Sequence, residues 1–241
     1  MSAGNKTLED LLAPISERLG HSQPPASVRK ADVAALAPAR CTDGLGHDEL
    51  VEMFVDEAEK IRIDVHRCQE GEVADVIAAI VANAADETHS GEVVYADDPR
   101  MITLGITAAL KETSQAKKLT RWDAEQGRDA LVAAADAAQF GITFATGAIA
   151  ETGTIVQPIT PQCGRSVSLL PLVHIAVVET STVVPTMLDA MQDLEKRSGE
   201  HGKDLPSQVC LISGPSVTSD IELVRVEGVH GPMFVHYVLV G

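Results

Sequence analysis

The sequence has no two cysteines close enough together to form a compact metal-binding motif. Its four cysteines, Cys41, Cys68, Cys163 and Cys210, are widely separated and include no C-x-x-C pair. Structural zinc sites and iron–sulfur clusters usually depend on closely spaced cysteines. We therefore expect no metal site and no iron–sulfur ligands in this chain, and the sequence indicates no other cofactor. In a reducing compartment the four thiols should be free.

The sequence also lacks long hydrophobic runs and an excess of positive charge. No apolar run approaches the roughly 18–20 residues of a membrane-spanning helix, and residues 1–7 lack the apolar core of a signal peptide. The net charge is −16, with 19 Lys and Arg against 35 Asp and Glu. Binding to nucleic acid requires clustered cations that neutralise phosphates. We expect a cytoplasmic protein without a nucleic-acid or membrane partner.

Several short enzyme motifs are missing as well. The sequence contains no phosphate-binding G-x-x-x-x-G-K-[ST], no H-E-x-x-H and no G-x-S-x-G. The spacing of Gly141, Gly147 and Gly153 does not fit the dinucleotide-binding fingerprint. The motifs alone therefore indicate no more than an α/β domain with a polar cleft.

Apolar residues at helical spacing predict most of the helices. A first helix ends near Gly20 and is followed by a Pro-rich connector at residues 22–27. We assign residues 1–47 to this helix and connector, and residues 48–241 to one α/β domain. Further helices are predicted from Asp48 as N-cap, over residues 73–84, from Asp123 to about Ala138, and from Pro185 to Leu194.

Short apolar and β-branched runs between these helices predict strands. Residues 172–179 are almost continuously apolar, which is typical of a strand covered on both faces. Strands that alternate with helices predict an α/β fold with a mixed sheet flanked by helices. The expected strands are residues 63–68, 92–96, 118–122, 141–148, 154–157, 172–179, 208–212 and 233–240.

The first segment that could carry chemistry is Ala150-Glu-Thr-Gly-Thr154, a small-residue turn with one carboxylate. Gly153 suits a positive-φ position, so Glu151 could be an exposed residue of a hairpin. Alternatively, Glu151 could be paired or face a cleft as nucleophile, base or hydrogen-bond acceptor. We take Glu151 as a candidate catalytic residue and Thr152 and Gly153 as candidate ligand-binding residues.

The second segment runs from Gly164 to His174. Arg165 could bind a carboxylate or phosphate with two hydrogen bonds, supported by Ser168, or it could cap a short helix at the surface. His174 begins an apolar strand, where a hydrogen-bonded core histidine is more common than a ligand. Arg165 and Ser168 are therefore candidate ligand-binding residues.

The third segment follows a predicted strand with Ser213-Gly-Pro-Ser216 and then a predicted helix start. Such junctions bind anions or cofactors in α/β folds. Ser219 and Glu222 also fit a capping box, and Asp220 suits a helix N-terminus. Because Asp220 and Glu222 would repel a phosphate, recognition of a hydroxyl or amide is favoured. The candidate ligand-binding residues here are Ser213, Gly214, Ser216, Asp220 and Glu222.

The fourth segment, Gly228-Val-His-Gly-Pro232, is a compact turn that presents His230. Glycine and proline explain the turn without any function. A histidine in a turn beside a late strand is nevertheless the best general acid–base candidate among the eight histidines. His230 thus joins Glu151 as a candidate catalytic residue.

Taken together, the four segments resemble the LUD domain, and more closely the LutC (YkgG) family of lactate utilization proteins. The resemblance extends in residue type and order from residue 141 to residue 232. One departure is Thr146-Gly147, where many relatives are expected to have Ala-Asp, so a carboxylate near Glu151 is missing. The segments that match are Gly141-Ile-Thr143, Ala148–Thr154, Arg165 to Ile175, Ile212–Ser216 with Asp220 to Glu222, and Gly228–Pro232.

The resemblance implies a fold like that of the NagB/RpiA/CoA-transferase group. It also implies a three-component system that oxidises L-lactate to pyruvate, in which iron–sulfur partner subunits carry the clusters. In such a system this chain would be a non-redox component that binds a small organic acid or scaffolds its partners, and a homodimer is compatible with it.

Two other functions stay open at this point. By analogy with the fold, the chain could be a CoA-transferase-like enzyme in which Glu151 accepts the acyl group. It could also be a non-catalytic binding or scaffold module. Whether the chain is itself an enzyme is undecided by the sequence. The decisive observation is whether Glu151, Arg165, residues 213–216 and His230 line one pocket.

Overall fold

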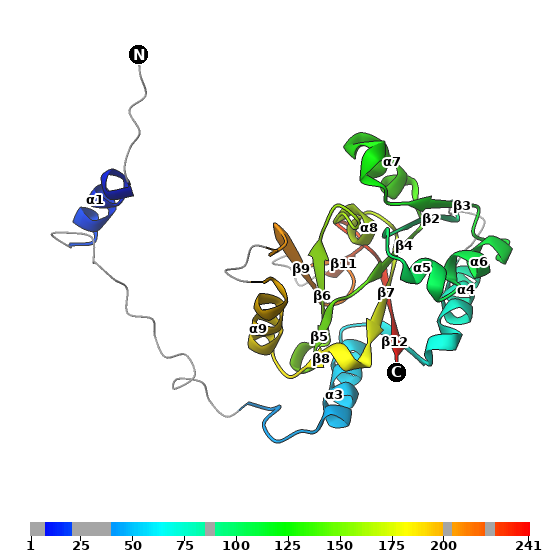
Figure 1. Ribbon diagram of the computed structural model, residues 1–241, viewed down its shortest axis with the longest axis horizontal. Helices are drawn as coiled ribbons and strands as arrows, with labels where there is room; N and C mark the ends of the chain where they lie inside the picture. Colours follow the sequence, from blue (N-terminus) through cyan, green and yellow to red (C-terminus); the bar gives the residue numbers. More distant parts are fainter. Residues whose placement is uncertain (1–7, 21–39, 85–89, 200–203, 220–224) are drawn as a thin grey trace, which may run out of the picture. The chain divides into compact units, whose positions relative to one another are not determined.

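The computed structural model describes residues 8–20, 40–84, 90–199, 204–219 and 225–241. Contacts divide the chain into two compact units, Met1–Arg40 and Cys41–Gly241. The first unit contains helix α1 (Leu8–Arg18). The second unit holds the strands and the other described helices (Figure 1).

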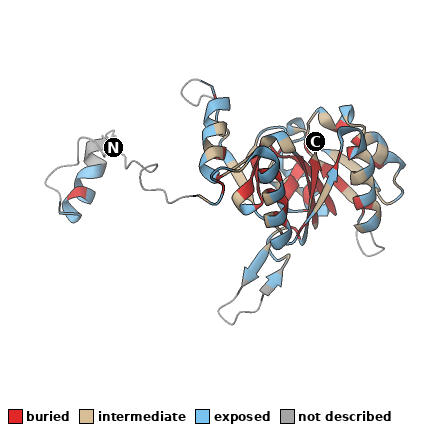
Figure 2. Ribbon diagram, turned by 90° about the horizontal axis from the view of Figure 1, so that it is seen from below, coloured by how far each residue is buried: buried red, intermediate tan, exposed pale blue. Residues whose placement is uncertain are grey.

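A parallel sheet forms the centre of the second unit. Among the described residues it has six strands in the order β1-β12-β7-β4-β2-β3, and every neighbouring pair is parallel. Its strands are β1 (Ile63–Cys68), β2 (Glu92–Tyr95), β3 (Lys118–Arg121), β4 (Phe140–Phe144), β7 (Val173–Glu179) and β12 (Phe234–Val240). The buried residues gather at its centre (Figure 2), where β4 and β7 are buried along almost their whole length, whereas the edge strand β3 has no buried residue.

A second sheet in the described part of the chain has four strands in the order β8-β5-β6-β9. It is mixed, because β6 is antiparallel to both neighbours while β5 and β8 are parallel. A separate hairpin of β10 (Val217–Ser219) and β11 (Arg225–Glu227) projects from the body (Figure 2). The strands of the second sheet are β5 (Gly147–Ile149), β6 (Thr154–Ile159), β8 (Val183–Val184) and β9 (Gln208–Ile212).

Helices cover both faces of the parallel sheet. Strand β7 is buried on both faces. Ala176 and Val178 pack in the cluster of α3, whereas Ile175 and Val177 pack in that of α4. The predicted α/β architecture is therefore confirmed. The α-helices are α3 (His47–Lys60), α4 (Val73–Ala84), α5 (Arg100–Thr103), α6 (Ile106–Glu112), α7 (Arg128–Ala137), α8 (Ser166–Leu169) and α9 (Met187–Arg197), and the 3-10 turns are Glu70–Glu72, Ala124–Gln126, Ala150–Thr152 and Thr180–Thr182.

Three predicted helix starts are wrong. Helix α3 has Gly46 as its N-cap, with the Glu49 carboxylate accepting from the Gly46 N–H at 2.8 Å, so Asp48 lies inside the helix. Asp123 caps only a 3-10 turn, because Gly127 takes a φ of 82° and separates that turn from α7. Pro185 precedes helix α9, whose N-cap is Thr186 in a capping box with Asp189.

Two further local predictions are also wrong. Residues 141–148 do not form one strand, because the chain leaves the parallel sheet after Phe144 and enters the second sheet at Gly147. No helix starts at Ser219, which instead ends strand β10. The β-branched residues Val217 and Thr218 favour the extended hairpin over a helix.

Candidate functional site

Glu151 lies in the 3-10 turn between β5 and β6, beside the start of helix α9. Its Oε1 accepts a hydrogen bond from the Met187 N–H at 3.0 Å. Its own N–H donates to the Pro185 carbonyl at 3.2 Å. Because the first N–H groups of a helix lack partners within the helix, a carboxylate placed there stabilises it. This contact gives Glu151 a role in joining the second sheet to α9.

The neighbouring residues of this turn pack against helix α3. Gly153 has a φ of +60°, and a Cβ built on it would lie 2.4 Å from the Ala58 nitrogen. Thr152 begins a chain of hydroxyls: its Oγ1 is 2.7 Å from Thr154 Oγ1, which is 2.5 Å from Ser213 Oγ. The turn is therefore tightly packed, and it reaches the third segment through hydroxyl groups.

Five of the candidate residues from the sequence do line one pocket. It has a volume of about 240 Å³ and lies at the amino ends of β7 and β12, beside the end of β9. We call it the late-loop pocket. Its predicted lining residues are Ser168, Ser213, Gly214, Ser216 and His230, and His174, Leu169, Leu211, Ile212, Gly231, Pro232 and Val235 complete it.

Backbone hydrogen bonds hold the loops around this pocket. Ser216 donates from its N–H to the Pro232 carbonyl at 2.8 Å, and the Gly228 N–H donates to the Ser216 carbonyl at 3.0 Å. Gly214 has a φ of +89° and would place a Cβ 2.8 Å from the Ile61 carbonyl oxygen. The third and fourth segments are thus fixed to one another, which explains why their polar residues converge.

His174 is a fully buried side chain of the pocket wall. Its Nε2 is 2.8 Å from Thr143 Oγ1. Its Nδ1 and Gln157 Oε1 are the buried side-chain polar atoms without a hydrogen-bond partner among the residues described. Burial, with a smaller effect of His236, lowers the pKa of His174 to about 4. The imidazole is therefore neutral near pH 7.

The other candidate residues do not line the late-loop pocket. Glu151 is at the start of α9, and Arg165 is an exposed residue at the N-cap of α8 whose carbonyl accepts from Ser168 Oγ at 3.1 Å. Asp220 and Glu222 lie outside the described residues. Since the described lining residues include no Asp or Glu, the pocket itself contains no carboxylate that would repel an anion.

A second hollow lies where the direction of the strand connections reverses, between the carboxyl ends of β2 and β4. Open α/β sheets commonly bind ligands at such a point. A cavity of about 140 Å³ there is lined by Asp98, Arg100 and Gln157. Arg100 already pairs with Asp98 at 2.8 Å and Glu179 at 2.9 Å. Sequence analysis missed this cavity, although Asp97 and Asp98 follow Ala96 just after strand β2.

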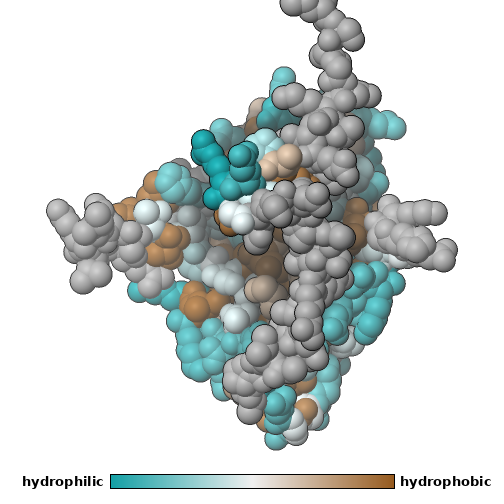
Figure 3. All heavy atoms as spheres, turned by 90° about the vertical axis from the view of Figure 1, so that its left-hand side faces the viewer, coloured by the Kyte–Doolittle hydropathy of each residue, from teal (hydrophilic) through white to brown (hydrophobic). Residues whose placement is uncertain are grey.

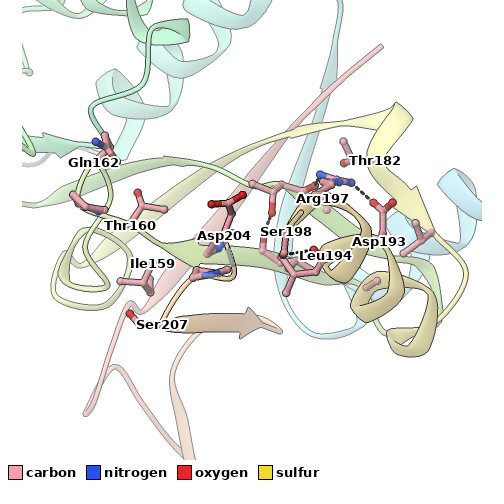
Figure 4. A pocket seen from close by; sticks show the side chains of 18 residues that line it. Ile159, Thr160, Gln162, Thr182, Asp193, Leu194, Arg197, Ser198, Asp204 and Ser207 are labelled. Atoms are coloured by element: carbon pink, nitrogen blue, oxygen red, sulfur yellow. Dashed lines mark hydrogen bonds and ion pairs between the residues drawn. The ribbon is translucent and has the colours of Figure 1, made fainter. Parts of the chain in front are cut away.

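A groove of about 520 Å³ adjoins this cavity and runs along α9 and β6 (Figure 4). Arg197 forms an ion pair with Asp193 and donates to the Thr146 carbonyl at 2.7 Å. Hydrophobic side chains gather in a hollow on the side of the molecule that bears β9, β6 and α9 (Figure 3). The Arg197 guanidinium thus already has partners that hold α9 to the β4–β5 turn. The late-loop pocket is therefore a better candidate for binding an anion than this groove.

Two properties of the described residues bear on cofactors and membranes. Within them, no group of three or more His, Cys, Asp or Glu side chains is arranged to hold a metal ion. No helix among them combines the length and apolar character needed to cross a bilayer.

Comparison with known proteins identifies the family. Residues 51–240 match the LUD domain. The chain belongs to the LUD domain family. This LUD domain chain is 34% identical to lactate utilization protein C of Halalkalibacterium halodurans, over 96% of each chain. It is 35% identical to that of Bacillus licheniformis, over 94% of this chain and 92% of the relative. The resemblance seen in the sequence is therefore confirmed.

A solved structure has the same fold as the LUD domain chain. It is the crystal structure of a DUF162 family protein from Deinococcus radiodurans, with a TM-score of 0.56 and 24% sequence identity. The match covers 82% of this chain and 99% of the other. At that identity the likeness shows the fold alone.

Proposed function

We propose that this chain is a component of an L-lactate utilization system and that it binds a small organic acid in the late-loop pocket. The observation that carries the proposal is the match to lactate utilization protein C over 96% of both chains. The same name belongs to the relative from Bacillus subtilis, which is 32% identical over 96% of this chain. Full-length similarity supports a shared pathway because it extends through the loops that form the pocket.

The chemistry of the late-loop pocket suits a small acid. Ser213 and Ser216 offer hydroxyl donors, and the His230 ring offers an N–H donor. None of the described lining residues is an Asp or Glu, so no carboxylate of the wall repels the acid.

We further propose that iron–sulfur proteins are the partners and that this chain supplies no cluster ligands. Its cysteines are widely separated and all four are free thiols. A surface for a partner lies beside the late-loop pocket, where large apolar side chains are exposed on α8, the β10–β11 hairpin and the turn at residues 228–234. Exposed apolar groups that gather in this way are typical of protein interfaces. They are Leu169, Leu170, Val217, Val226, Val229, Met233 and Phe234.

A CoA-transferase-like reaction at Glu151 receives less support from the geometry. The Glu151 carboxylate accepts from the Met187 N–H, and it does not line the late-loop pocket. A nucleophile would have to give up that contact to attack an acyl group. Incubation with acyl-CoA and a search for a mass adduct on Glu151 tests the alternative directly, and an adduct would favour it.

The proposed function is tested in a host that needs this chain for growth on L-lactate. We expect deletion to stop growth on L-lactate, and the wild-type chain to restore it. A chain with both Ser213→Ala and Ser216→Ala should fold but restore growth poorly, whereas Ser114→Ala, an exposed serine elsewhere, should restore it fully. Normal growth of the deletion strain on L-lactate would contradict the pathway assignment.

Binding of the acid is tested separately by calorimetry on the purified chain. L-lactate and pyruvate are the probes. Loss of two hydroxyl donors should weaken binding by about tenfold or more, since each hydrogen bond contributes about 0.5–1.5 kcal/mol. If neither acid binds while deletion still stops growth, the pathway role stands and the organic-acid site is wrong.

A further inference from the structure

A further cavity, of about 710 Å³, lies between helix α4 and strands β1, β7 and β12. It shares no lining residue with the late-loop pocket. Much of its wall is apolar, with Val76, Ala79 and Ile80 from α4 facing Leu172 and Phe234. Its volume falls in the range of about 300–1,000 Å³ that small-molecule sites occupy. We call it the histidine cavity, after the residues at its polar end.

The polar end of the histidine cavity consists of Asp64, His66 and His236. Asp64 is the register partner of His236 in the parallel pair β1–β12, and His66 follows two residues later, so all three project from one face of the sheet. His66 Nε2 is 3.1 Å from His236 Nδ1. The Asp64 carboxylate lies 3.6 Å from His236 Nδ1. The two imidazoles therefore form one hydrogen-bonded pair beside a carboxylate.

This pair has a fixed hydrogen-bonding capacity. Burial lowers the pKa of both histidines, more than the nearby Asp64 raises it, so both rings are neutral near pH 7. One ring must donate to the other across the 3.1 Å contact. A neutral imidazole has one N–H and one lone pair. Whichever ring donates, the two outer nitrogens, His66 Nδ1 and His236 Nε2, then offer one donor and one acceptor.

We propose that the histidine cavity binds an uncharged small molecule with a hydroxyl group on an apolar body. A hydroxyl both donates and accepts, so it can bond to either outer nitrogen in either arrangement of the protons. A carboxylate can only accept, and Asp64 would repel it. The apolar body packs against the α4 wall, where its removal from water supplies most of the affinity. This site is independent of the proposed organic-acid site.

Matched probes test the proposal on the full chain. Benzyl alcohol and ethylbenzene have nearly the same shape, and only the alcohol has a hydroxyl. Benzoate adds the negative charge. We expect benzyl alcohol to bind about fivefold or more tighter than the other two, the difference expected of one hydrogen bond. Titration by NMR should shift the ring nitrogen signals of His66 and His236, with calorimetry giving the affinities.

Variants test separately the role of the histidine pair and that of the apolar wall. His66→Phe and His236→Phe should abolish the preference for benzyl alcohol, with His66→Gln as a second variant if the first fails to fold. Ala79→Phe, which fills the cavity mouth, should abolish binding of both neutral probes. His47→Ala, an exposed histidine on α3, is the control and should bind as the wild type does. Equal or tighter binding of ethylbenzene by the wild type, or no binding of any probe, would overturn the proposal.

Discussion

The Glu151 carboxylate shows how one residue can look chemical in a sequence and act structurally in the fold. A lone acid in a run of small residues suggests catalysis, because nothing nearby in the sequence pairs with it. Its partner is the Met187 N–H, 36 residues away. A contact between residues so far apart leaves no local pattern, so the sequence could not reveal it.

Substitution of Glu151 should therefore reduce stability. We expect Glu151→Ala to lower the free energy of unfolding by about 1 kcal/mol, as loss of an acceptor at a helix N-terminus does. Glu151→Gln keeps an acceptor oxygen and should cost less. Urea unfolding measures both, with Glu195→Ala, an exposed acid on the same helix, as control. Unchanged stability together with loss of growth on L-lactate would point to catalysis instead.

His174 gives the molecule a predictable dependence on pH. Burial lowers its pKa from 6.5 to about 4. The unfolded chain takes up this proton below about pH 6.5, whereas the folded chain takes it up only near pH 4. Stability should therefore fall as pH drops through that window, by about 1.4 kcal/mol per unit and about 3 kcal/mol in all for this group.

Two His→Gln substitutions, at His174 and at His230, test the pH dependence of stability. Urea unfolding between pH 7 and pH 4 should show a flatter acid limb for His174→Gln than for the wild type. His230→Gln, at an exposed histidine, is the control substitution. If His174→Gln keeps the wild-type slope, His174 does not cause the loss of stability in acid.

At the scale of elements, the presence of helices and strands could be predicted from the sequence better than the residues at which they begin and end. The strand at residues 63–68 and the helix at residues 73–84 have the predicted bounds, because apolar spacing and burial agree there. Gly127 and the junction at residues 145–146 were missed, since each break depends on how the chain packs rather than on its local pattern. Among the candidate site residues, Glu151 and Arg165 did not converge with the others on one pocket, whereas five did: Ser168, Ser213, Gly214, Ser216 and His230.

The packing of the β5–β6 turn on helix α3 makes Gly153 hard to replace. A methyl group at Gly153 would lie 2.4 Å from the Ala58 nitrogen, and the residue also has a positive φ. Gly153→Ala should lower the free energy of unfolding by about 2–5 kcal/mol, the sum of overpacking and a left-handed backbone. Thermal unfolding checks this against Gly71→Ala, where a Cβ meets nothing within 4 Å. An equal loss of stability in Gly153→Ala and Gly71→Ala would show that α3 moves to make room for the added methyl group.

At the scale of the whole molecule, the exposed apolar surface beside the late-loop pocket should carry the partner. We expect Val226→Asp with Val229→Asp to leave folding intact and to reduce co-purification with iron–sulfur proteins by about tenfold or more, as charges in an interface centre do. Ile102→Asp is the matched control, because Ile102 is 78% exposed on α5. Retention of the partners by the double variant would place the interface elsewhere.

Strand β12 lies between β1 and β7 in the parallel sheet. Among the described strands β1 has only β12 as a neighbour. During synthesis, β1 leaves the ribosome early but cannot join the sheet until residues 234–240 follow. A nascent chain must therefore hold β1 without a neighbouring strand for most of its translation, and contacts this distant along the sequence form slowly. Ribosome-bound chains that stop before residue 234 should consequently remain sensitive to protease around β1.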